Sequence, residues 1–425
     1  MEHKASVAVV GGGVAGIVSA YLLDRAGYDV TLFEKNNYLG GHTKTVVLEQ
    51  GPDAGLAVDT GFIVLNDQTY PLFHRFLRGL NVVVRFSDMS FGYYCSQTNF
   101  CYAGTSLSGL FAQRRNLFSA RFYRMLRDIR RFSADALTAL EDGRAAGKSL
   151  GEFISGGGYS SWMVQRYLLP MAAAIWSAPF QGIEHFPAES FFRFFKNHGL
   201  LSLENRPRWQ TVVGGSYSYV TAFAKIFRGR IYLGQPVAGV ARDERTGRIR
   251  VRLSGGEVMS FDRLIIAAHA DQALAVLEDP SPHEARLLGL YAYQRNTGAL
   301  HTDPTVLSPL RRAWASWNYT QSVSERADRP VFVTYHMNRL QGFKASRDYF
   351  VSLNPAHNFE PEKVLEHLDF EHPVYTMENK AAQPELAALN GWRGTYYCGS
   401  YFGYGFHEDA VRAAAAAVRD FGVEL

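Results

Sequence analysis

The sequence predicts an α/β fold whose first unit is a parallel sheet with a helix between neighbouring strands. Three observations predict it: an apolar run at residues 7–10, helical spacing of apolar residues over 17–26, and a second apolar run at 28–33. Gly27 separates the helix from the second run and suits the left-handed position that often follows a helix. Strand, helix and strand in this order form the repeating unit of a parallel sheet.

A glycine cluster joins the first strand to the helix. Gly11, Gly13 and Gly16 follow the pattern Gly-x-Gly-x-x-Gly. This turn lets the backbone approach a pyrophosphate at the start of a helix, where amides and the helix dipole favour negative charge. Glu34 ends the second strand, and a carboxylate about 20 residues past the glycines accepts hydrogen bonds from ribose hydroxyls. We therefore expect a bound dinucleotide.

Later segments identify the dinucleotide. They are the pair Gly40-Gly41 followed by His42, the segment 58–63, the pair Gly214-Gly215, the strand 231–237, the strand 261–268, and the run 396–409 that leads into an alanine-rich helix. In this order they resemble flavoproteins of the amine oxidase and phytoene desaturase type. The resemblance implies FAD as the cofactor. The residues it places at FAD are Gly11, Gly13, Val14, Ala15, Gly16, Glu34, Lys35, Gly40, Gly41, His42, Gly61, Phe62, Ile63, Val237, Ala267, Gly399, Ser400, Phe406 and His407.

The same resemblance implies how the chain is divided. It implies a Rossmann-type FAD domain of the glutathione reductase kind, interleaved with an α+β substrate domain and a helical segment. Residues 1–65, 208–275 and 391–425 are expected to assemble the FAD domain. Residues 66–207 are expected to form a mainly helical substrate or membrane segment, and residues 276–390 the α+β substrate domain.

Shorter motifs resemble a narrower group. They are Leu-Gly-Gly-His-Thr at 39–43, Asp-Thr-Gly-Phe-Ile-Val-Leu-Asn at 59–66, Trp-Ala-Ser-Trp-Asn-Tyr at 314–319, Met-Asn-Arg-Leu-Gln at 337–341 and Gly-Tyr-Gly-Phe-His-Glu-Asp at 403–409. They resemble bacterial flavoproteins associated with cyclopropane-synthase-like methyltransferases, which desaturate methylated phospholipid acyl chains in furan fatty acid formation. The resemblance implies oxidation of a methyl-branched unsaturated fatty acyl or phospholipid substrate to a conjugated diene, with a methyltransferase of the same pathway as a partner.

Three other functions stay open. A fatty-acid double-bond isomerase would use the same flavin site but return the hydride to a different carbon. An amine oxidase would oxidise a C–N bond, although His42 stands where such enzymes usually carry an arginine. A non-catalytic chain would bind acyl groups for the methyltransferase.

Candidate catalytic residues come from the middle of the chain. His198 is a candidate for proton transfer. Lys196 resembles the lysine that many amine oxidases hold near the flavin, and Tyr335 places a hydroxyl group among aromatic residues. The chain contains 29 Phe and 23 Tyr, a content that suits a tunnel for a long apolar chain as well as an ordinary core.

An arginine-rich segment at 112–136 indicates a membrane partner. Its apolar residues recur at steps of four and three and predict one helix face: Phe118, Phe122, Met125, Ile129 and Phe132. Seven arginines between Arg114 and Arg131 flank that face, opposed only by Asp128. Such a helix can rest on an anionic membrane surface. The alternative is a core helix with a solvated basic face. No groove-reading module accompanies the arginines, so no nucleic acid is expected.

Composition limits the remaining classes. The three cysteines and 13 histidines show no metal-ligand spacing, so no metal site is expected. The net charge is only +4, and no run approaches the roughly 18 apolar residues of a membrane span. The apolar run at residues 7–10 is too short for a signal peptide. We expect a cytoplasmic protein that is peripheral on the inner membrane face.

Overall fold

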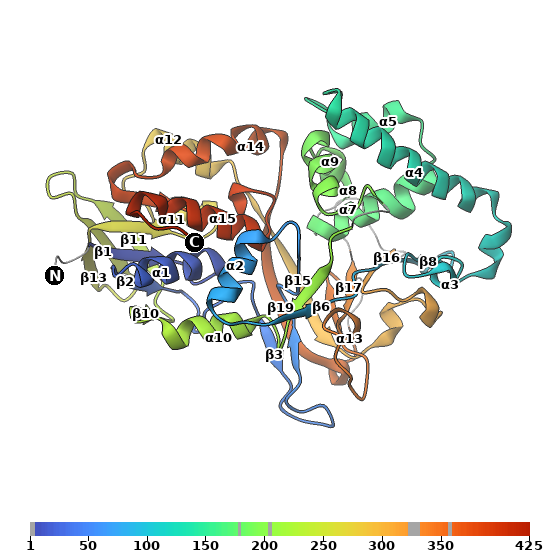
Figure 1. Cartoon of the computed structure of the whole chain (residues 1–425), viewed down its shortest axis with the longest axis horizontal. Helices are drawn as coiled ribbons and strands as arrows, with labels where there is room; N and C mark the ends of the chain where they lie inside the picture. Colours follow the sequence, from blue (N-terminus) through green and yellow to red (C-terminus); the bar gives the residue numbers. More distant parts are fainter. Residues whose placement is uncertain (1–4, 177–179, 203–205, 322–331, 356–358) are drawn as a thin grey trace.

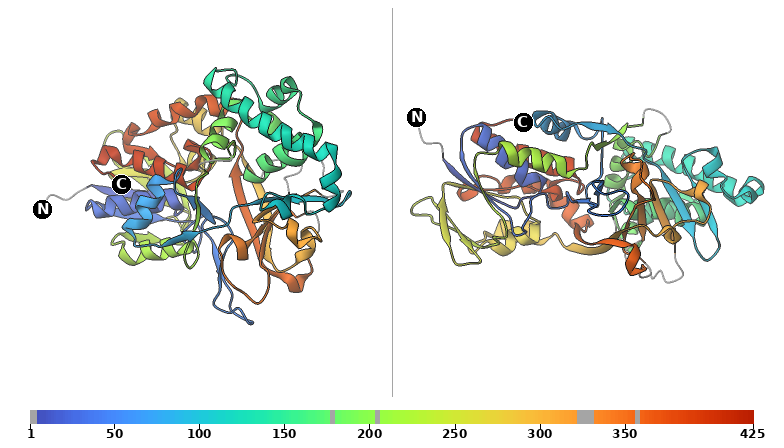
Figure 2. Two further views of the ribbon diagram at one scale, coloured as in Figure 1. Left: turned by 45° about the vertical axis from the view of Figure 1, so that its right-hand side comes forward. Right: turned by 90° about the horizontal axis from the view of Figure 1, so that it is seen from below.

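The computed structural model describes residues 5–176, 180–202, 206–321, 332–355 and 359–425. A parallel sheet and its helices form one half of the molecule, and a second sheet and a group of helices form the other (Figure 1). The views of Figure 2 show the same two halves and place the C-terminus in the first. The predicted α/β fold class is confirmed.

The first half is built on a five-stranded parallel sheet in the order β10-β2-β1-β14-β20. Its strands are β1 (Ser6–Val10), β2 (Asp29–Phe33), β10 (Arg230–Tyr232), β14 (Arg263–Ile266) and β20 (Thr395–Tyr397). Val7 and Val9 pack in one apolar cluster with α1 (Val14–Arg25), α10 (Tyr217–Ile226) and α15 (His407–Ala417). Ala8 and Val10 belong to the other cluster, because successive strand residues point to opposite faces.

A small antiparallel sheet covers the other face. It consists of β11 (Val237–Arg242), β12 (Ile249–Leu253) and β13 (Val258–Phe261), followed by α11 (Ala270–Val276), α12 (Pro282–Gly289) and, much later, α14 (Met377–Ala382). Here Arg242 and Glu284 form an ion pair at 2.6 Å, with side chains only 2% and 1% exposed. Tyr397 also donates to Glu284, which links this layer to β20.

The second half contains a seven-stranded sheet in the order β19-β15-β18-β17-β16-β7-β8. The strands are β7 (Phe91–Cys95), β8 (Phe100–Ala103), β15 (Tyr293–His301), β16 (Trp317–Gln321), β17 (Val333–His336), β18 (Phe350–Leu353) and β19 (Val364–Pro373). Helix α13 (Met337–Leu340) follows β17. The strands β7 and β8 lie within the 66–207 segment that is expected to be mainly helical, and β7 pairs in parallel with β16.

Short strands and helices complete the second half. Two small sheets connect the halves. One pairs β3 (Thr45–Val47) with β4 (Ala57–Asp59), and the other consists of β5 (Val64–Asn66), β9 (Trp209–Val212) and β6 (Val84–Phe86). The helices of the second half are α3 (Leu107–Leu110), α4 (Ala120–Glu141), α5 (Leu150–Gly157), α6 (Ser161–Met163), α7 (Leu169–Trp176), α8 (Phe180–Glu184) and α9 (Ala188–Asn197). Helix α2 (Pro71–Gly79) belongs to the first half, where it packs in the apolar cluster of α1 and α15. Across the described ranges, no helix combines the length and apolar character that a bilayer span needs.

Helix α4 corrects the predicted membrane face. It begins after Ser119, whose side chain accepts from the Phe122 amide. Phe122, Met125 and Phe132 are fully buried in the core, so this stripe packs inward. Phe118 precedes the helix and is 92% exposed. The apolar stripe is therefore a core face, as the alternative interpretation holds, and only its first residue faces solvent.

Candidate active site

One cavity of about 1590 Å³ is lined by residues from both halves. Gly11, Glu34, Ala267 and Gly399 follow the carboxyl ends of β1, β2, β14 and β20 and form part of its wall. Ligands of open parallel sheets bind outside these strand ends. The volume exceeds the roughly 300–1,000 Å³ of a pocket for one small molecule. The cavity can therefore hold a dinucleotide and a second ligand.

The three glycines of the first turn have different structural roles. A Cβ on Gly16 would lie 1.8 Å from the Gly11 carbonyl oxygen, and Gly11 has φ +105° with its own Cβ position 2.5 Å from the Ala267 oxygen. Both must be glycine for the turn to close. A Cβ on Gly13 would meet no atom within 4 Å, and Gly13 lines the cavity. Gly13 therefore leaves space for whatever binds at the start of α1.

Glu34 holds the glycine turn and faces the cavity. Its Oε2 accepts from the Gly12 amide at 2.7 Å, and its Oε1 accepts from the backbone and side-chain nitrogens of Asn36 at 2.8 Å. The side chain is buried. Because a carboxylate oxygen can accept two hydrogen bonds, Oε2 retains capacity for a ribose hydroxyl.

A second glycine loop closes the same wall. The Gly40 amide donates to the Gly12 carbonyl at 2.7 Å, and Gly40 has φ +115°. A Cβ on Gly61 would lie 1.9 Å from the His42 oxygen, so the segments around these residues pass in direct contact. The loops after β2 and β4 thus meet the first glycine turn.

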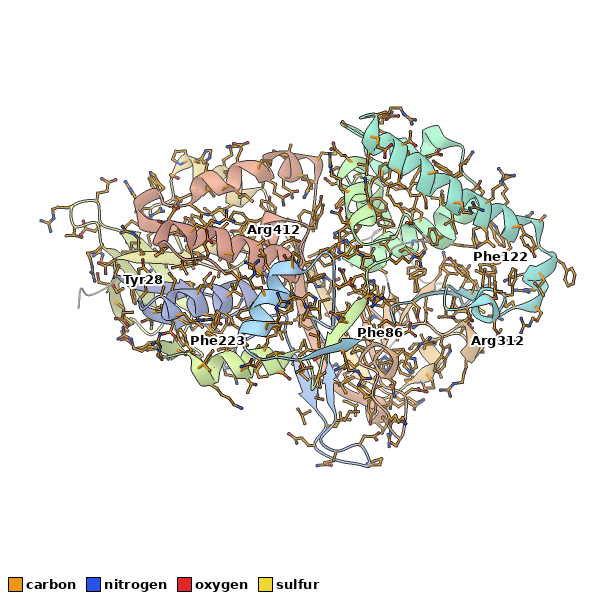
Figure 3. All side chains as sticks on the ribbon, viewed as in Figure 1. Tyr28, Phe86, Phe122, Phe223, Arg312 and Arg412 are labelled. Atoms are coloured by element: carbon orange, nitrogen blue, oxygen red, sulfur yellow. The ribbon has the colours of Figure 1, made fainter. Side chains whose placement is uncertain are left out.

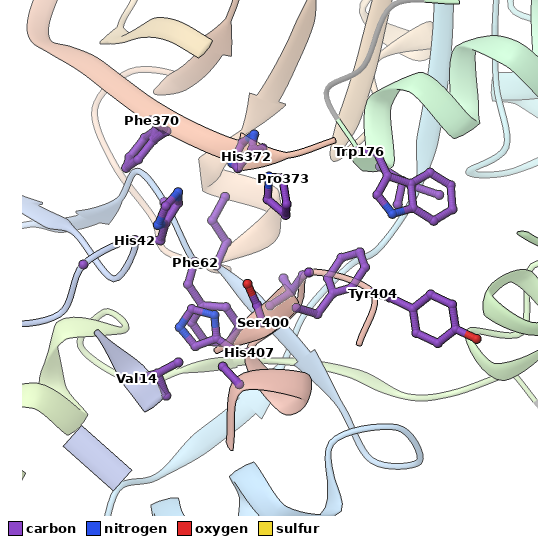
Figure 4. A pocket seen from close by; sticks show the side chains of 18 of the residues that line it. Val14, His42, Phe62, Trp176, Phe370, His372, Pro373, Ser400, Tyr404 and His407 are labelled. Carbon is purple, nitrogen blue, oxygen red and sulfur yellow. The ribbon is translucent and has the colours of Figure 1, made fainter. Parts of the chain in front are cut away.

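Five histidines of the described chain line the cavity; one is His198, and the other four are His42, His269, His372 and His407. Burial lowers the pKa of His42, and it lowers the pKa of His269, His372 and His407 to about 3. These four rings are therefore neutral at pH 7. His42 and His372 lie near Phe370 in Figure 4, and the ring centroids of the two histidines are 5.4 Å apart. His407 stacks on Phe62 at 3.7 Å. Within the described ranges, no group of His, Cys, Asp or Glu is arranged to hold a metal ion.

The part of the cavity beyond His407 is aromatic. We call it the aromatic arm; its wall includes Tyr102, Trp176, Phe194, Trp209, Trp317, Tyr335, Tyr404 and Phe406. Figure 4 shows Trp176 and Tyr404 at this side, away from His42. The arm continues into the helical group along Leu110, Leu126 and Ile129. Its apolar wall suits a hydrocarbon chain.

His198 is the histidine of the aromatic arm. Its ring stacks on Phe194 at 3.9 Å, and Nδ1 lies 2.9 Å from the Phe194 carbonyl oxygen. A carbonyl can only accept, so Nδ1 carries the proton and Nε2 is the basic nitrogen. Nε2 lies 3.5 Å from the Thr69 hydroxyl. Burial lowers the pKa of His198, which keeps the ring neutral and able to accept a proton.

Comparison with known proteins places the chain in a family. The model of the family described as flavin-containing amine oxidoreductase matches residues 14–306. The chain belongs to this family. It is therefore a flavin-dependent oxidoreductase.

Two solved structures resemble this family member over nearly its whole length. The fatty acid isomerase from P. acnes that produces CLA has a TM-score of 0.69 at 14% identity and covers 99% of each chain. A putrescine oxidase bound to putrescine has a TM-score of 0.72 at 14% identity and covers 98% of this chain and 99% of that one. At this identity the likeness establishes the fold.

One curated relative matches a short segment only. The 4,4'-diapolycopen-4-al dehydrogenase of Metabacillus indicus is 35% identical over 66 residues, which are 14% of this chain and 13% of the relative. The match thus spans about an eighth of that relative's length. It carries no information about the rest of the chain.

The cavity fits FAD, the cofactor of this flavoprotein. The space above Gly13 lies at the start of α1, where the diphosphate would be held, and Glu34 lies where the adenosine ribose would be held. The segments around Gly61 and His407 would hold the isoalloxazine end. Every residue that the sequence places at FAD lines the cavity except Gly16, which packs against Gly11 instead.

The candidate catalytic residues separate in the structure. His198 and Tyr335 line the cavity, and Tyr335 lies edge-on to Trp317 at 5.0 Å. Burial raises the pKa of Tyr335, so its hydroxyl stays protonated. The prediction that Lys196 lies near the flavin is wrong. Lys196 lies in the last turn of α9, is exposed and is not part of the cavity wall. Residue 196 follows the buried Phe194 and Phe195 on the outer side of the helix.

The sequence does not predict some residues of the cavity wall. His269 stands two residues after Ala267, so the signal that placed Ala267 at FAD could have been extended to it. His372 and Trp209 stand in strands that carry no recognisable motif. Only the pairing of distant strands brings them to the cavity.

Proposed function

We propose that this protein desaturates a methyl-branched unsaturated fatty acyl chain to a conjugated diene, a step towards a furan fatty acid. The aromatic arm is the observation that carries the proposal. A long apolar ligand can lie along it, from the helical group to the end marked by Phe406. The narrower sequence resemblance supplies the methyl branch and the furan product.

The charges around the arm support an uncharged substrate. Asp88 lines the cavity but pairs with Arg339 at 2.7 Å, and Asp369 pairs with Arg295. Two of the acidic residues in the described cavity wall are therefore neutralised by arginines. A cationic amine would gain little there, which favours the acyl chain over the amine substrate.

The residues of the aromatic arm would hold the substrate, exclude water and accept a proton. FAD, when bound, supplies the two-electron acceptor that takes a hydride from the substrate. Trp176, Phe194 and Tyr404 hold the chain and exclude water, which protects the reacting carbon. His198 Nε2 accepts the proton that leaves the neighbouring position, and the Phe194 carbonyl stabilises the resulting imidazolium through Nδ1. Hydride and proton together account for the two hydrogens lost.

Double-bond isomerisation is the second candidate. The P. acnes structure is described as a fatty acid isomerase, and its fold extends over the same length as this chain. The same arm and base would serve if the hydride returned to another carbon. Such a reaction leaves the substrate mass unchanged.

A mass measurement distinguishes these functions. The purified protein with FAD is incubated with lipids that carry methyl-branched monounsaturated acyl chains, and the products are analysed by mass spectrometry. Loss of two hydrogens with a new conjugated-diene absorbance supports desaturation. An unchanged mass with a moved double bond supports isomerisation. Bound but unaltered lipid supports an acyl-binding role, and hydrogen peroxide formed only with amines supports amine oxidation; either result overturns the proposal.

A variant tests the assigned base. His198→Gln should lower the rate of diene formation by about 10²- to 10⁴-fold, the usual contribution of a general base, with FAD content unchanged. The control His185→Gln changes an exposed histidine of the same helical group and should leave the rate unchanged. A His198→Gln protein that works at the parental rate removes His198 from the mechanism.

A further inference from the structure

The end of the molecule formed by η1 (Arg114–Phe118), α3 and the start of α4 exposes unusual apolar residues. Their exposed fractions are 77% for Leu107, 40% for Leu117, 92% for Phe118 and 48% for Tyr123. Single exposed apolar residues are common, but four on adjoining segments form a patch. Figure 3 labels nearby Phe122 and Arg312 at the end of the molecule opposite Tyr28.

Positive charge surrounds this patch. The exposed arginines on the same segments and on the adjoining turn are Arg114, Arg115, Arg121, Arg124, Arg127 and Arg312. Asp128 is the only acidic residue between positions 104 and 134. It is buried, and its Oδ2 accepts from the Ser160 amide at 2.9 Å. The solvent-facing charge of these segments is therefore positive. We call this patch and its arginines the arginine-rich end.

The arginine-rich end is rigid rather than loosely attached. The Tyr123 hydroxyl donates to the Leu117 carbonyl oxygen at 3.1 Å and holds η1 against α4. Ser106 and Ser119 cap α3 and α4 through their side chains. The apolar side chains are thus presented on a fixed surface, which lowers the entropy lost when the surface binds a partner.

The aromatic arm approaches this same end. Leu110 of α3 lines the cavity one turn after the exposed Leu107, and Leu126 of α4 lines it one turn after the exposed Tyr123. Gly104, which precedes α3, lines the cavity and is exposed. Residues three apart lie on the same side of a helix, so on both helices a solvent-exposed residue stands next to one that lines the cavity.

We propose that the arginine-rich end docks on an anionic phospholipid bilayer. Guanidinium groups would bind lipid phosphates, while Phe118 and Leu107 enter the boundary between headgroups and acyl chains. This surface matches a bilayer because its arginines suit the charged headgroup layer, and its aromatic and aliphatic residues suit the apolar layer of acyl chains beneath it. The proposal deepens the proposed function, because docking would set the entrance of the aromatic arm against the acyl chains of the bilayer.

Vesicle binding tests the proposal directly. The holoprotein is sedimented with vesicles of phosphatidylcholine alone and of phosphatidylcholine with phosphatidylglycerol. We expect binding to the anionic vesicles that falls steeply as NaCl rises from about 0.05 M to about 0.5 M, since added salt shortens the Debye length. Equal binding to neutral vesicles, or no binding to either, overturns the proposal.

Matched variants locate the contact. Arg114→Ser/Arg121→Ser/Arg124→Ser should weaken binding at least about tenfold, because each basic residue at an anionic surface contributes about fivefold. Leu107→Ser/Phe118→Ser should do the same through lost apolar contact. The controls Arg245→Ser/Arg250→Ser/Arg419→Ser and Val47→Ser/Val258→Ser make equal changes at exposed positions elsewhere. If test and control variants bind alike, the arginine-rich end is not the contact.

Turnover separates docking from chemistry. The test variants should lose activity on anionic vesicles but keep the parental rate on the same lipid dispersed in detergent. If the parent protein binds vesicles but converts neither form, the proposed function fails while docking stands. If it converts detergent-dispersed lipid but does not bind vesicles, docking fails while the proposed function stands.

Discussion

Gly13→Val should weaken FAD binding without harming the fold. Gly13 has φ −72° and ψ −179°, an extended conformation that valine adopts readily, and a Cβ there meets no atom within 4 Å. The free energy of unfolding of the apoprotein should therefore stay the same or rise by about 0.4–1 kcal/mol, since valine restricts the unfolded chain. The new methyl groups occupy the space at the start of α1. Losing one charge-assisted hydrogen bond to the diphosphate costs about 1.5–3 kcal/mol, or about 10- to 150-fold in FAD affinity.

Two measurements check this prediction. Urea unfolding of the apoprotein, followed by circular dichroism, reports the fold, and quenching of flavin fluorescence during titration reports FAD affinity. Gly16→Ala is the contrasting variant: its Cβ would lie 1.8 Å from the Gly11 oxygen, so apoprotein stability should fall by about 1–3 kcal/mol. A stable Gly13→Val protein that binds FAD within about threefold of the parent would refute the placement of the diphosphate.

Two further predictions concern buried charges. Burial raises the pKa of Asp59 to about 7, so the folded state keeps a proton that the unfolded carboxyl releases near pH 4; the free energy of unfolding should fall between about pH 4 and pH 7 and then level off. Asp59→Asn can keep the contacts of Oδ1 with Thr45 and Ser216 and should remove that fall, as urea midpoints measured across the pH range would reveal; parallel curves for the two proteins would contradict it. Glu284→Ala leaves the buried Arg242 without its closest partner and should cost about 3 kcal/mol in urea unfolding. The control Glu385→Ala breaks an exposed pair with Arg286 and should cost less than about 1 kcal/mol; equal losses would argue against the importance of burial.

Local patterns predict the cofactor side of the molecule well. The strand at 29–33, the glycine turn and the helix near 407 depend on residues close together in the sequence, and the structure has them as β2, the start of α1 and α15. Gly11, Glu34 and His407 can be placed because each stands at a strand end or a helix start. Backbone geometry fixes what may stand at such positions, so the sequence carries a readable signal there.

The substrate side depends on distant pairings that no local pattern encodes. Strands β7 and β8 were expected within a helical segment, and their partner β16 lies far along the chain. The stripe from Phe122 to Phe132 has the same spacing whether it faces a core or a membrane, and only packing decides that it is buried. Lys196 likewise follows a motif, but the direction of its side chain depends on how α9 packs.

The parallel pairing of β7 with β16 has a consequence for how the chain folds. Trp317 pairs with Phe91, and Tyr396 pairs with Ile265, so both sheets close only after most of the chain has been synthesised. Contacts between residues so distant in sequence form slowly, because a long loop must close before they contribute. Ser400 and His407 complete the cavity wall and follow β20, the strand that closes the first sheet. FAD can therefore be enclosed only after both sheets have closed, and a chain that stalls earlier would expose the aromatic wall that later holds the ligand.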